Sequence, residues 1–284
     1  MKKKVIIGGQ AVIEGVLMKS PNYYNISIRK KKKIISKKEK LKKKPQFYKF
    51  FFIRGIVNLI EMLTIGIKAL NWSAEQVEGG EELKKTHKIF TIIFAILVGL
   101  GLFLYLPLLL TKLLYSKESV IFNLIDGIIR IIILILYIYL ISLWKDIKII
   151  YQYHGAEHKA VNCYENNKTL TIKNCKKYST LHPRCGTSFL IIVLIISILV
   201  FSLIVSPKFH IKLLGRIVLL PVIIGLSYEL LKLTDKFKEN KFVKLIAIPG
   251  LWIQKITTKE PNNKQLEVAL ISLKNVLKLE QKSQ

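Results

Sequence analysis

Two short strings of metal-ligand residue types stand near each other in the middle of the chain. The first reads His154-Gly-Ala-Glu-His158 and the second reads His182-Pro-Arg-Cys185. On a helix, residues four positions apart share one face, so the first string would present two imidazoles side by side. Imidazole and thiolate are ligands that zinc favours. We therefore predict a divalent metal site, with zinc as its ion, built from His154, His158, His182 and Cys185.

The same strings contain two candidates for catalytic work. H-x-x-E-H is the inverted zincin pattern, in which zinc hydrolases activate water, and it places Glu157 beside the histidines as a base. Arg184 is the second candidate, because a guanidinium offers a planar, bidentate fork. Such enzymes usually take a third ligand from a downstream carboxylate, and the nearest acid, Glu229, falls inside an apolar segment. The alternative reading is that these residues hydrogen-bond a cytosolic loop together without any metal.

The composition indicates that these strings belong to an α-helical integral membrane protein. About half of the residues are hydrophobic (51%), yet the formal net charge is +28. The two values are compatible because apolar and charged residues are segregated along the chain. Apolar stretches of about 20 residues are long enough to cross the roughly 30 Å hydrocarbon core of a bilayer. We predict about four transmembrane helices, at 89–111, 122–144, 189–206 and 211–233.

The remaining segments predict a small α+β cytosolic portion built from the N-terminus, the central loop and a C-terminal helix. Residues 1–49 are basic and rich in short strands and turns, and 145–188 form the loop that carries both strings. Residues 50–70 are apolar but interrupted by charges, which is typical of an interfacial or re-entrant amphipathic helix. Residues 245–284 predict an interfacial segment followed by a helix capped at Asn262 or Asn263.

The distribution of basic residues predicts the orientation in the membrane. The first 49 residues hold sixteen Lys and Arg and the loop 145–188 holds eight, whereas the joins near 112–120 and 207–212 hold two lysines each. Both termini and the central loop are therefore expected on the cytoplasmic face of a bacterial membrane. Cys163, Cys175 and Cys185 all lie in that loop, so free thiols or metal ligands are expected rather than disulfides.

The lysine-rich stretches 30–33 and 37–44 have two readings. They bind anionic lipid headgroups or ribosomal RNA, or they form a solvated basic loop at the membrane face. No aromatic residues alternate with these lysines, so nucleotide stacking is not expected and nucleic acid is not the favoured partner. The lipid bilayer is the expected partner, and the substrate would be a lipid or a membrane protein.

Arginine is rare in this chain, and three of the five arginines lie within apolar segments, at Arg54, Arg130 and Arg216. Unpaired charge is costly inside a membrane, so we expect several arginines to pair with carboxylates. Asp126 lies four residues before Arg130 and is the expected local partner.

Several longer blocks resemble the YqhQ family of bacterial multi-pass membrane proteins, a domain of unknown function. The blocks begin at Gly8-Gly-Gln-Ala-Val-Ile-Glu14, Tyr153-His-Gly-Ala-Glu-His158 and His182-Pro-Arg-Cys-Gly186, with others at Ser227-Tyr-Glu229, Pro249-Gly-Leu-Trp252 and Thr257-Thr258. The resemblance covers nearly the whole length and implies a predicted metal-dependent enzyme without a known substrate. The lysine-rich insert near 30–44 is particular to this chain.

Three functions follow from these observations. The first is a metal-dependent hydrolase acting at the cytoplasmic membrane face. The alternative is a non-catalytic membrane scaffold or accessory factor with a structural metal or none, which a closed four-ligand site would favour. The third is a small ion-coupled transporter that uses the ionisable groups of the spans, namely Asp126, Arg130, Arg216 and Glu229.

Overall fold

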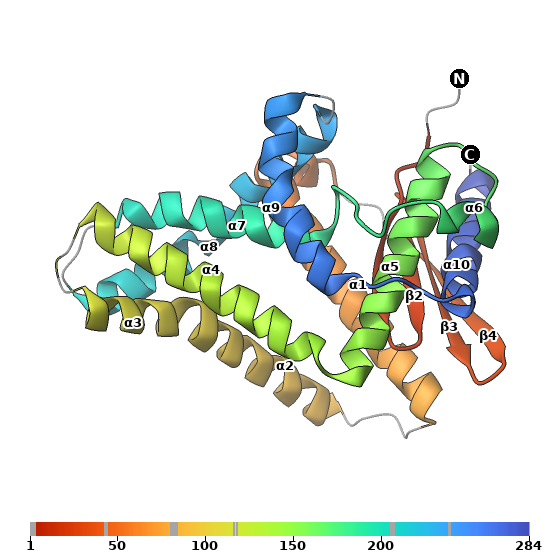
Figure 1. Ribbon diagram of the computed structural model, residues 1–284, viewed down its shortest axis with the longest axis horizontal. Helices are drawn as coiled ribbons and strands as arrows, with labels where there is room; N and C mark the ends of the chain where they lie inside the picture. The colour runs from red at the N-terminus through yellow and green to blue at the C-terminus, as the bar shows by residue number, and fades with distance from the viewer. Residues whose placement is uncertain are drawn as a thin grey trace.

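The computed structural model consists of a helical bundle joined to a small sheet that is covered by helices (Figure 1). It describes residues 4–42, 45–79, 85–115, 117, 119–204, 208–237 and 240–283. Outside these ranges lie residues 1–3 and two lysines of the predicted segment 1–49. Residues 205 and 206 of the predicted third span also lie outside them. The first strand, β1, belongs to the sheet, and the last helix, α10, lies beside it, away from the bundle (Figure 1).

The sheet is an antiparallel meander in the order β1-β2-β3-β4. Its strands are β1 Gly8–Val12, β2 Gly15–Lys19, β3 Tyr23–Lys30 and β4 Lys33–Lys40. The short turn between β1 and β2 requires a left-handed backbone, which Glu14 adopts with φ of 51°. The strands predicted near the N-terminus are confirmed. Most of the described residues of the two basic stretches continue the sheet, because β4 pairs with β3 along its whole length.

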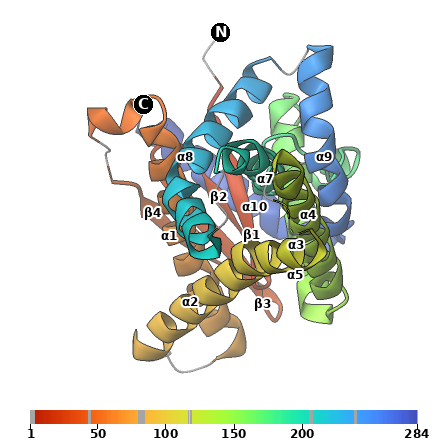
Figure 2. The same ribbon diagram turned by 90° about the vertical axis from the view of Figure 1, so that its left-hand side faces the viewer.

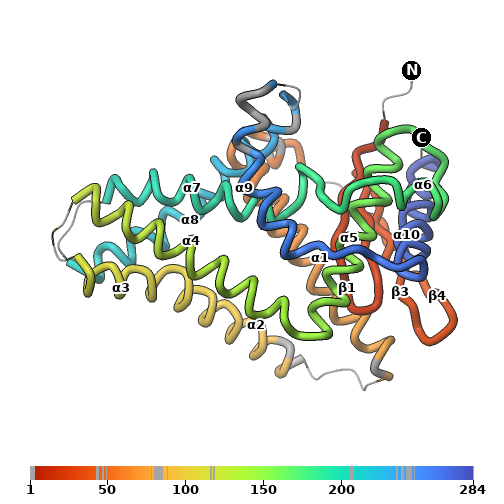
Figure 3. The backbone as a smooth tube through the Cα atoms, in the orientation of Figure 1, coloured from red at the N-terminus to blue at the C-terminus, as the bar shows by residue number. Residues whose placement is uncertain are grey.

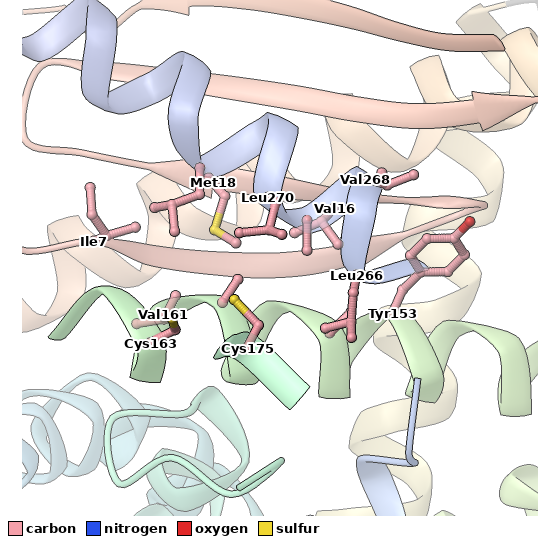
Figure 4. Close-up of a cluster of buried hydrophobic side chains, with 14 of the residues drawn as sticks. Ile7, Val16, Met18, Tyr153, Val161, Cys163, Cys175, Leu266, Val268 and Leu270 are labelled. Atoms are coloured by element: carbon pink, nitrogen blue, oxygen red, sulfur yellow. The ribbon is translucent and has the colours of Figure 1, made fainter. Parts of the chain in front are cut away.

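Both faces of the sheet are buried, each against a different helix layer. On one face, Val12, Leu17 and Ile26 pack against α1 (Ile53–Glu78) through Ile65 and Ala69. The other face packs against α5 (Lys145–Glu165), the short α6 (Ile172–Lys176) and α10 (Asn263–Lys282). Figure 4 shows this second core, where strand residues meet apolar side chains of α5, α6 and α10. α5 is thus held rigidly by the sheet.

The C-terminal helix begins as the sequence predicts. Asn262 accepts a hydrogen bond from the backbone N–H of Gln265, and the Gln265 side chain accepts one from the Asn262 N–H, which completes a capping box. Residues 169–172 of the central loop lead into α6, because the Thr171 side chain caps that helix by accepting from the Asn174 N–H.

Among the described residues, three helices of the bundle are long and apolar enough to cross a membrane. The first, Ile89–Leu114, runs through α2 (Lys85–Leu100), η2 (Gly101–Tyr105) and α3 (Leu106–Leu114). The second, Val120–Ser142, is α4. The third, Phe209–Thr234, lies within α8 (Phe209–Lys236). The π-helical turn η2 precedes Pro107, which has no N–H to donate to an earlier carbonyl.

The prediction of four spans is therefore corrected to three. The segment predicted at 189–206 forms α7, Gly186–Ser202, a shorter apolar helix of 17 residues. Its rise of about 25 Å falls short of a typical hydrocarbon core. The helix begins at Cys185 because that thiol caps it, and α7 then packs along α8 and α4 within the bundle (Figure 2).

Two further helices join the bundle to the sheet. The N-terminal half of α1 packs on α8, where Asn58 donates to the Tyr228 hydroxyl at 2.7 Å and Arg54 pairs with Glu229. The predicted interfacial segment 50–70 is thus part of a 26-residue helix that continues across the sheet. α9 (Lys241–Thr257) packs mainly on α7 and ends beside α5 (Figure 3).

The pairing predicted for the arginines is confirmed. Asp126 binds both Arg130 and Arg216, and Arg54 binds Glu229. The other two arginines also have carboxylate partners: Arg29 pairs with Glu267 and Arg184 with Glu165.

Candidate metal centre

Two turns of α5 form the base of the candidate metal site. Because α5 has 3.6 residues per turn, His154 and His158 lie on one face, and their ring centroids are 4.4 Å apart. Gly155 faces the segment that joins α9 to α10, where the Lys259 N–H donates to the Tyr151 carbonyl at 2.9 Å. The close approach of these two backbones leaves no room for a side chain at position 155.

Cys185 completes the group from a different element. Its Sγ atom lies 3.2 Å from His154 Nε2 and is also in hydrogen-bonding contact with His158. The cysteine is the N-cap of α7, and its sulfur accepts a hydrogen bond from the Thr187 N–H at 3.5 Å. The sulfur is therefore held at the N-terminus of α7, facing the two imidazoles.

Backbone carbonyls fix the orientation of both imidazoles. His154 Nδ1 donates to the Thr257 carbonyl at 2.9 Å, and His158 Nδ1 donates to the Thr180 carbonyl. A carbonyl oxygen only accepts, so each Nδ1 carries a proton, and Nε2 is the ring nitrogen left to face a ligand. Metal-bound histidines are typically held in this way, by a hydrogen bond from the other ring nitrogen.

The three ligand atoms fit a zinc ion. One atom from each of His154, His158 and Cys185 lies within 4.8 Å of the others. Tetrahedral zinc with Zn–N of about 2.0 Å and Zn–S of about 2.3 Å sets its ligands roughly 3.3–3.8 Å apart, so a small inward shift would close the shell. Burial lowers the pKa of His158, although its contacts with Cys185 and Thr180 oppose this change. His158 is therefore neutral near pH 7, as a ligand must be.

Glu157 lies on the flank of the two histidines, between α5 and the sheet. Its side chain packs against Gly9 of β1, where an added Cβ would lie 2.8 Å from the Glu157 Cγ and Cδ atoms. Burial raises the pKa of this carboxyl, while His154 and His182 lower it. Gly9 therefore makes room for the motif carboxylate, a role that the sequence did not reveal.

His182 and Arg184 lie next to the group but make other contacts. The His182 ring is 5.7 Å from that of His158, centroid to centroid, and its Nε2 lies 3.3 Å from a Glu165 carboxylate oxygen. Its Nδ1 accepts from the Arg184 N–H at 3.3 Å. The Arg184 guanidinium pairs with the same Glu165, at the end of α5. The structure thus brings three of the four predicted ligands together and places His182 and Arg184 on Glu165.

Residues that the sequence analysis did not select hold this arrangement in place. Gln254 of α9 is fully buried, accepts from the His182 N–H and donates to the His182 carbonyl and to Ser188 Oγ, each at 2.9 Å. On the other side, Glu14 accepts from the Tyr153 hydroxyl at 3.0 Å. A glutamine within an apolar segment was a usable signal for Gln254, whereas the Thr180 and Thr257 carbonyls have no signature in sequence.

Comparisons with known proteins agree with this picture at the level of family. Residues 50–279 match the family model described as "Protein of unknown function (DUF1385)". The chain is also 36% identical to the "Uncharacterized protein YqhQ" of Bacillus subtilis (strain 168), with 96% of this chain and 92% of that protein covered. No solved structure matches the chain. The chain belongs to the YqhQ family, whose function is unknown.

Proposed function

We propose that this protein is a membrane-embedded, zinc-dependent hydrolase whose site opens at the cytoplasmic face of the bilayer. One observation carries the proposal: both imidazoles donate Nδ1–H to backbone carbonyls and turn Nε2 toward the Cys185 sulfur. A loop that merely needed hydrogen bonds would not require two unprotonated nitrogens and a thiol to converge.

The ligand count favours catalysis over a purely structural ion. Catalytic zinc sites have three protein ligands and one open position, and three ligand atoms converge here. Zinc supplies Lewis acidity and lowers the pKa of water toward neutrality. Glu157 would take the proton from the attacking water, and the partial exposure of His154 supports access from solvent.

The position of the site indicates the class of substrate. Cys185 begins α7, and α5 follows α4 after a turn at Leu143 and Trp144, so the ligands lie next to the ends of apolar helices. With the basic N-terminal segment and the central loop on the cytoplasmic side, the site faces the cytosol–bilayer boundary. A lipid or a segment of a membrane protein is the substrate that would reach it.

A structural zinc is the second candidate, and the burial of the ligands favours it. Cys185 and His158 are 6% and 2% exposed, and the group joins α5, α7 and, through Thr257, the end of α9. An ion there would clamp the sheet to the bundle without any reaction, as expected for an accessory factor.

Cobalt substitution separates the two candidates. Cobalt(II) in the site should give a thiolate charge-transfer band that Cys185→Ser removes. Addition of a hydroxamate, a chelating mimic of a hydrolytic transition state, should change the visible spectrum if a coordination position is open. A spectrum that no small ligand alters would contradict the hydrolase and leave the structural role. Glu157→Gln is the matched variant: it should retain cobalt and change the pH dependence of the spectrum.

A further inference from the structure

A second cluster of charged side chains lies inside the bundle, at the end far from the sheet. It contains Asp126 and Arg130 of α4 and Arg216 of α8. Both α4 and α8 begin at the end of the bundle opposite the sheet (Figure 1). Asp126 lies about 10 Å along α4 from its first residue, and Arg216 lies about 10 Å along α8 from its first residue. The cluster is therefore separate from the metal centre.

The contacts of the cluster are well defined. The Asp126 Oδ1 atom accepts from Arg216 Nη1 at 2.8 Å, and Oδ2 accepts from Arg130 Nη2. Arg130 Nη1 donates to Ser197 Oγ of α7 at 2.9 Å. Both guanidinium carbons lie about 5 Å from the centroid of the Phe201 ring, at 4.9 and 5.1 Å. The three charged side chains are 1–3% exposed.

The charges of this cluster do not balance. Two guanidinium groups, which do not lose their protons in proteins, surround a single carboxylate, so the triad has a net charge of +1. Within the part of the chain that the structure describes, Arg130 Nε and Arg216 Nη2 are buried and have no hydrogen-bond acceptor. Uncompensated buried charge is strongly unfavourable, above all between helices that cross a membrane.

The described neighbours of the triad supply no second carboxylate. In the described parts of 106–134 and 190–224, Asp126 is the one carboxylate. The excess positive charge of the triad is therefore not balanced by another acidic side chain of these parts.

We propose that the Asp126–Arg130–Arg216 triad binds one oxyanion of the phosphate type. The oxyanion accepts hydrogen bonds from Arg216 Nη2 and Arg130 Nε and removes the excess positive charge. Guanidinium groups suit this chemistry because their planar donors match phosphate oxygens. The phosphate comes either from a phospholipid headgroup that enters between α4 and α8 or from dissolved phosphate.

Native mass spectrometry of the full chain in detergent tests the site on the wild-type protein. Phosphatidylglycerol, diacylglycerol and inorganic phosphate are titrated separately. For a lipid source, phosphatidylglycerol should bind about tenfold more tightly than diacylglycerol, which lacks the phosphate, the value expected of one charge-assisted hydrogen bond. For a dissolved source, phosphate itself should bind with a stoichiometry of one. Equal binding of both lipids, with no retained phosphate, would overturn the proposal.

Two variants that change the net charge of the triad in opposite directions distinguish loss of a binding site from a general loss of structure. Arg216→Gln removes the excess charge and should weaken anion binding about tenfold, whereas Asp126→Asn adds to that excess and should strengthen it. Lys145→Gln, with the same charge change as Arg216→Gln at an exposed position of α5, should bind as the wild type does. Weaker binding in both triad variants would contradict the proposal. If neither variant folds, the wild-type titrations decide.

Discussion

A single methyl group placed at Gly155 should disturb both the fold and the metal centre. A Cβ atom at this position would lie 2.1 Å from the Lys259 carbonyl oxygen and 3.3 Å from Thr180 Cγ2. The first contact is more than 1 Å too short and involves backbone, which cannot rotate away. The segment after α9 must therefore move away from α5, together with the hydrogen bond from the Lys259 N–H to the Tyr151 carbonyl.

The magnitude follows from these contacts. Overpacking of this kind costs about 1–3 kcal/mol, and loss of the backbone hydrogen bond costs about 1 kcal/mol more. Alanine regains about 1 kcal/mol as a better helix former than glycine. We expect Gly155→Ala to lower the free energy of unfolding by about 1–3 kcal/mol. Because Thr257 precedes Lys259 by two residues and orients His154, zinc affinity should also fall by about 10–100-fold.

Gly186→Ala provides the matched control. Gly186 is the first residue of α7, follows the ligand Cys185, and has no atom within 4 Å of an added Cβ. The free energy of unfolding of the Gly186→Ala variant should stay the same or rise by up to about 1 kcal/mol. Thermal unfolding in detergent and zinc competition with a chelator measure both quantities. If Gly155→Ala is as stable as Gly186→Ala and binds zinc equally well, the close packing of α5 against the segment after α9 is refuted.

Three further substitutions test other contacts. In chemical denaturation, Gln254→Ala should lower the free energy of unfolding by about 2–4 kcal/mol, because the His182 N–H and carbonyl lose their partner. Gln281→Ala, at an exposed position of α10, should change the free energy of unfolding little. Tyr153→Phe removes the donor to Glu14 and should cost about 1–2 kcal/mol by thermal unfolding, and an unchanged midpoint would show that this bond is not formed. Asp126→Asn should destabilise the bundle by about 3–5 kcal/mol, because two buried arginines lose their carboxylate, and anionic lipid should restore part of the loss in a melting assay.

The sequence predicted those features that depend on local spacing. His154 and His158 share a face because a helix repeats every 3.6 residues, and Asp126 meets Arg130 for the same reason. The capping of the last helix by Asn262 also depends on neighbouring residues alone. Such features need no knowledge of how distant segments pack.

Features that depend on distant segments were not predicted. His182 and Cys185 are three residues apart, yet it is the Cys185 sulfur that lies 3.2 Å from an imidazole nitrogen, whereas His182 Nε2 lies beside Glu165 and Gln254 holds the His182 backbone. The start of α7 was placed three residues too late for a related reason: hydropathy identifies apolar residues, whereas the helix begins at Gly186, directly after the Cys185 thiol that caps it. The β4 strand was missed because its lysines suggested a solvated loop or a binding surface, although one edge of β3 was free to pair with it.

The most direct test of the proposed metal centre is the metal content of the purified full-length protein, measured by elemental mass spectrometry. We expect about one zinc per chain in the wild type and a loss of zinc in His158→Ala and Cys185→Ser. His182→Ala should retain zinc because the His182 ring is turned toward Glu165, and His210→Ala, an exposed position at the far end of the bundle, serves as the control. A folded wild type without stoichiometric metal, or a Cys185→Ser variant that retains its full zinc content, would contradict the account.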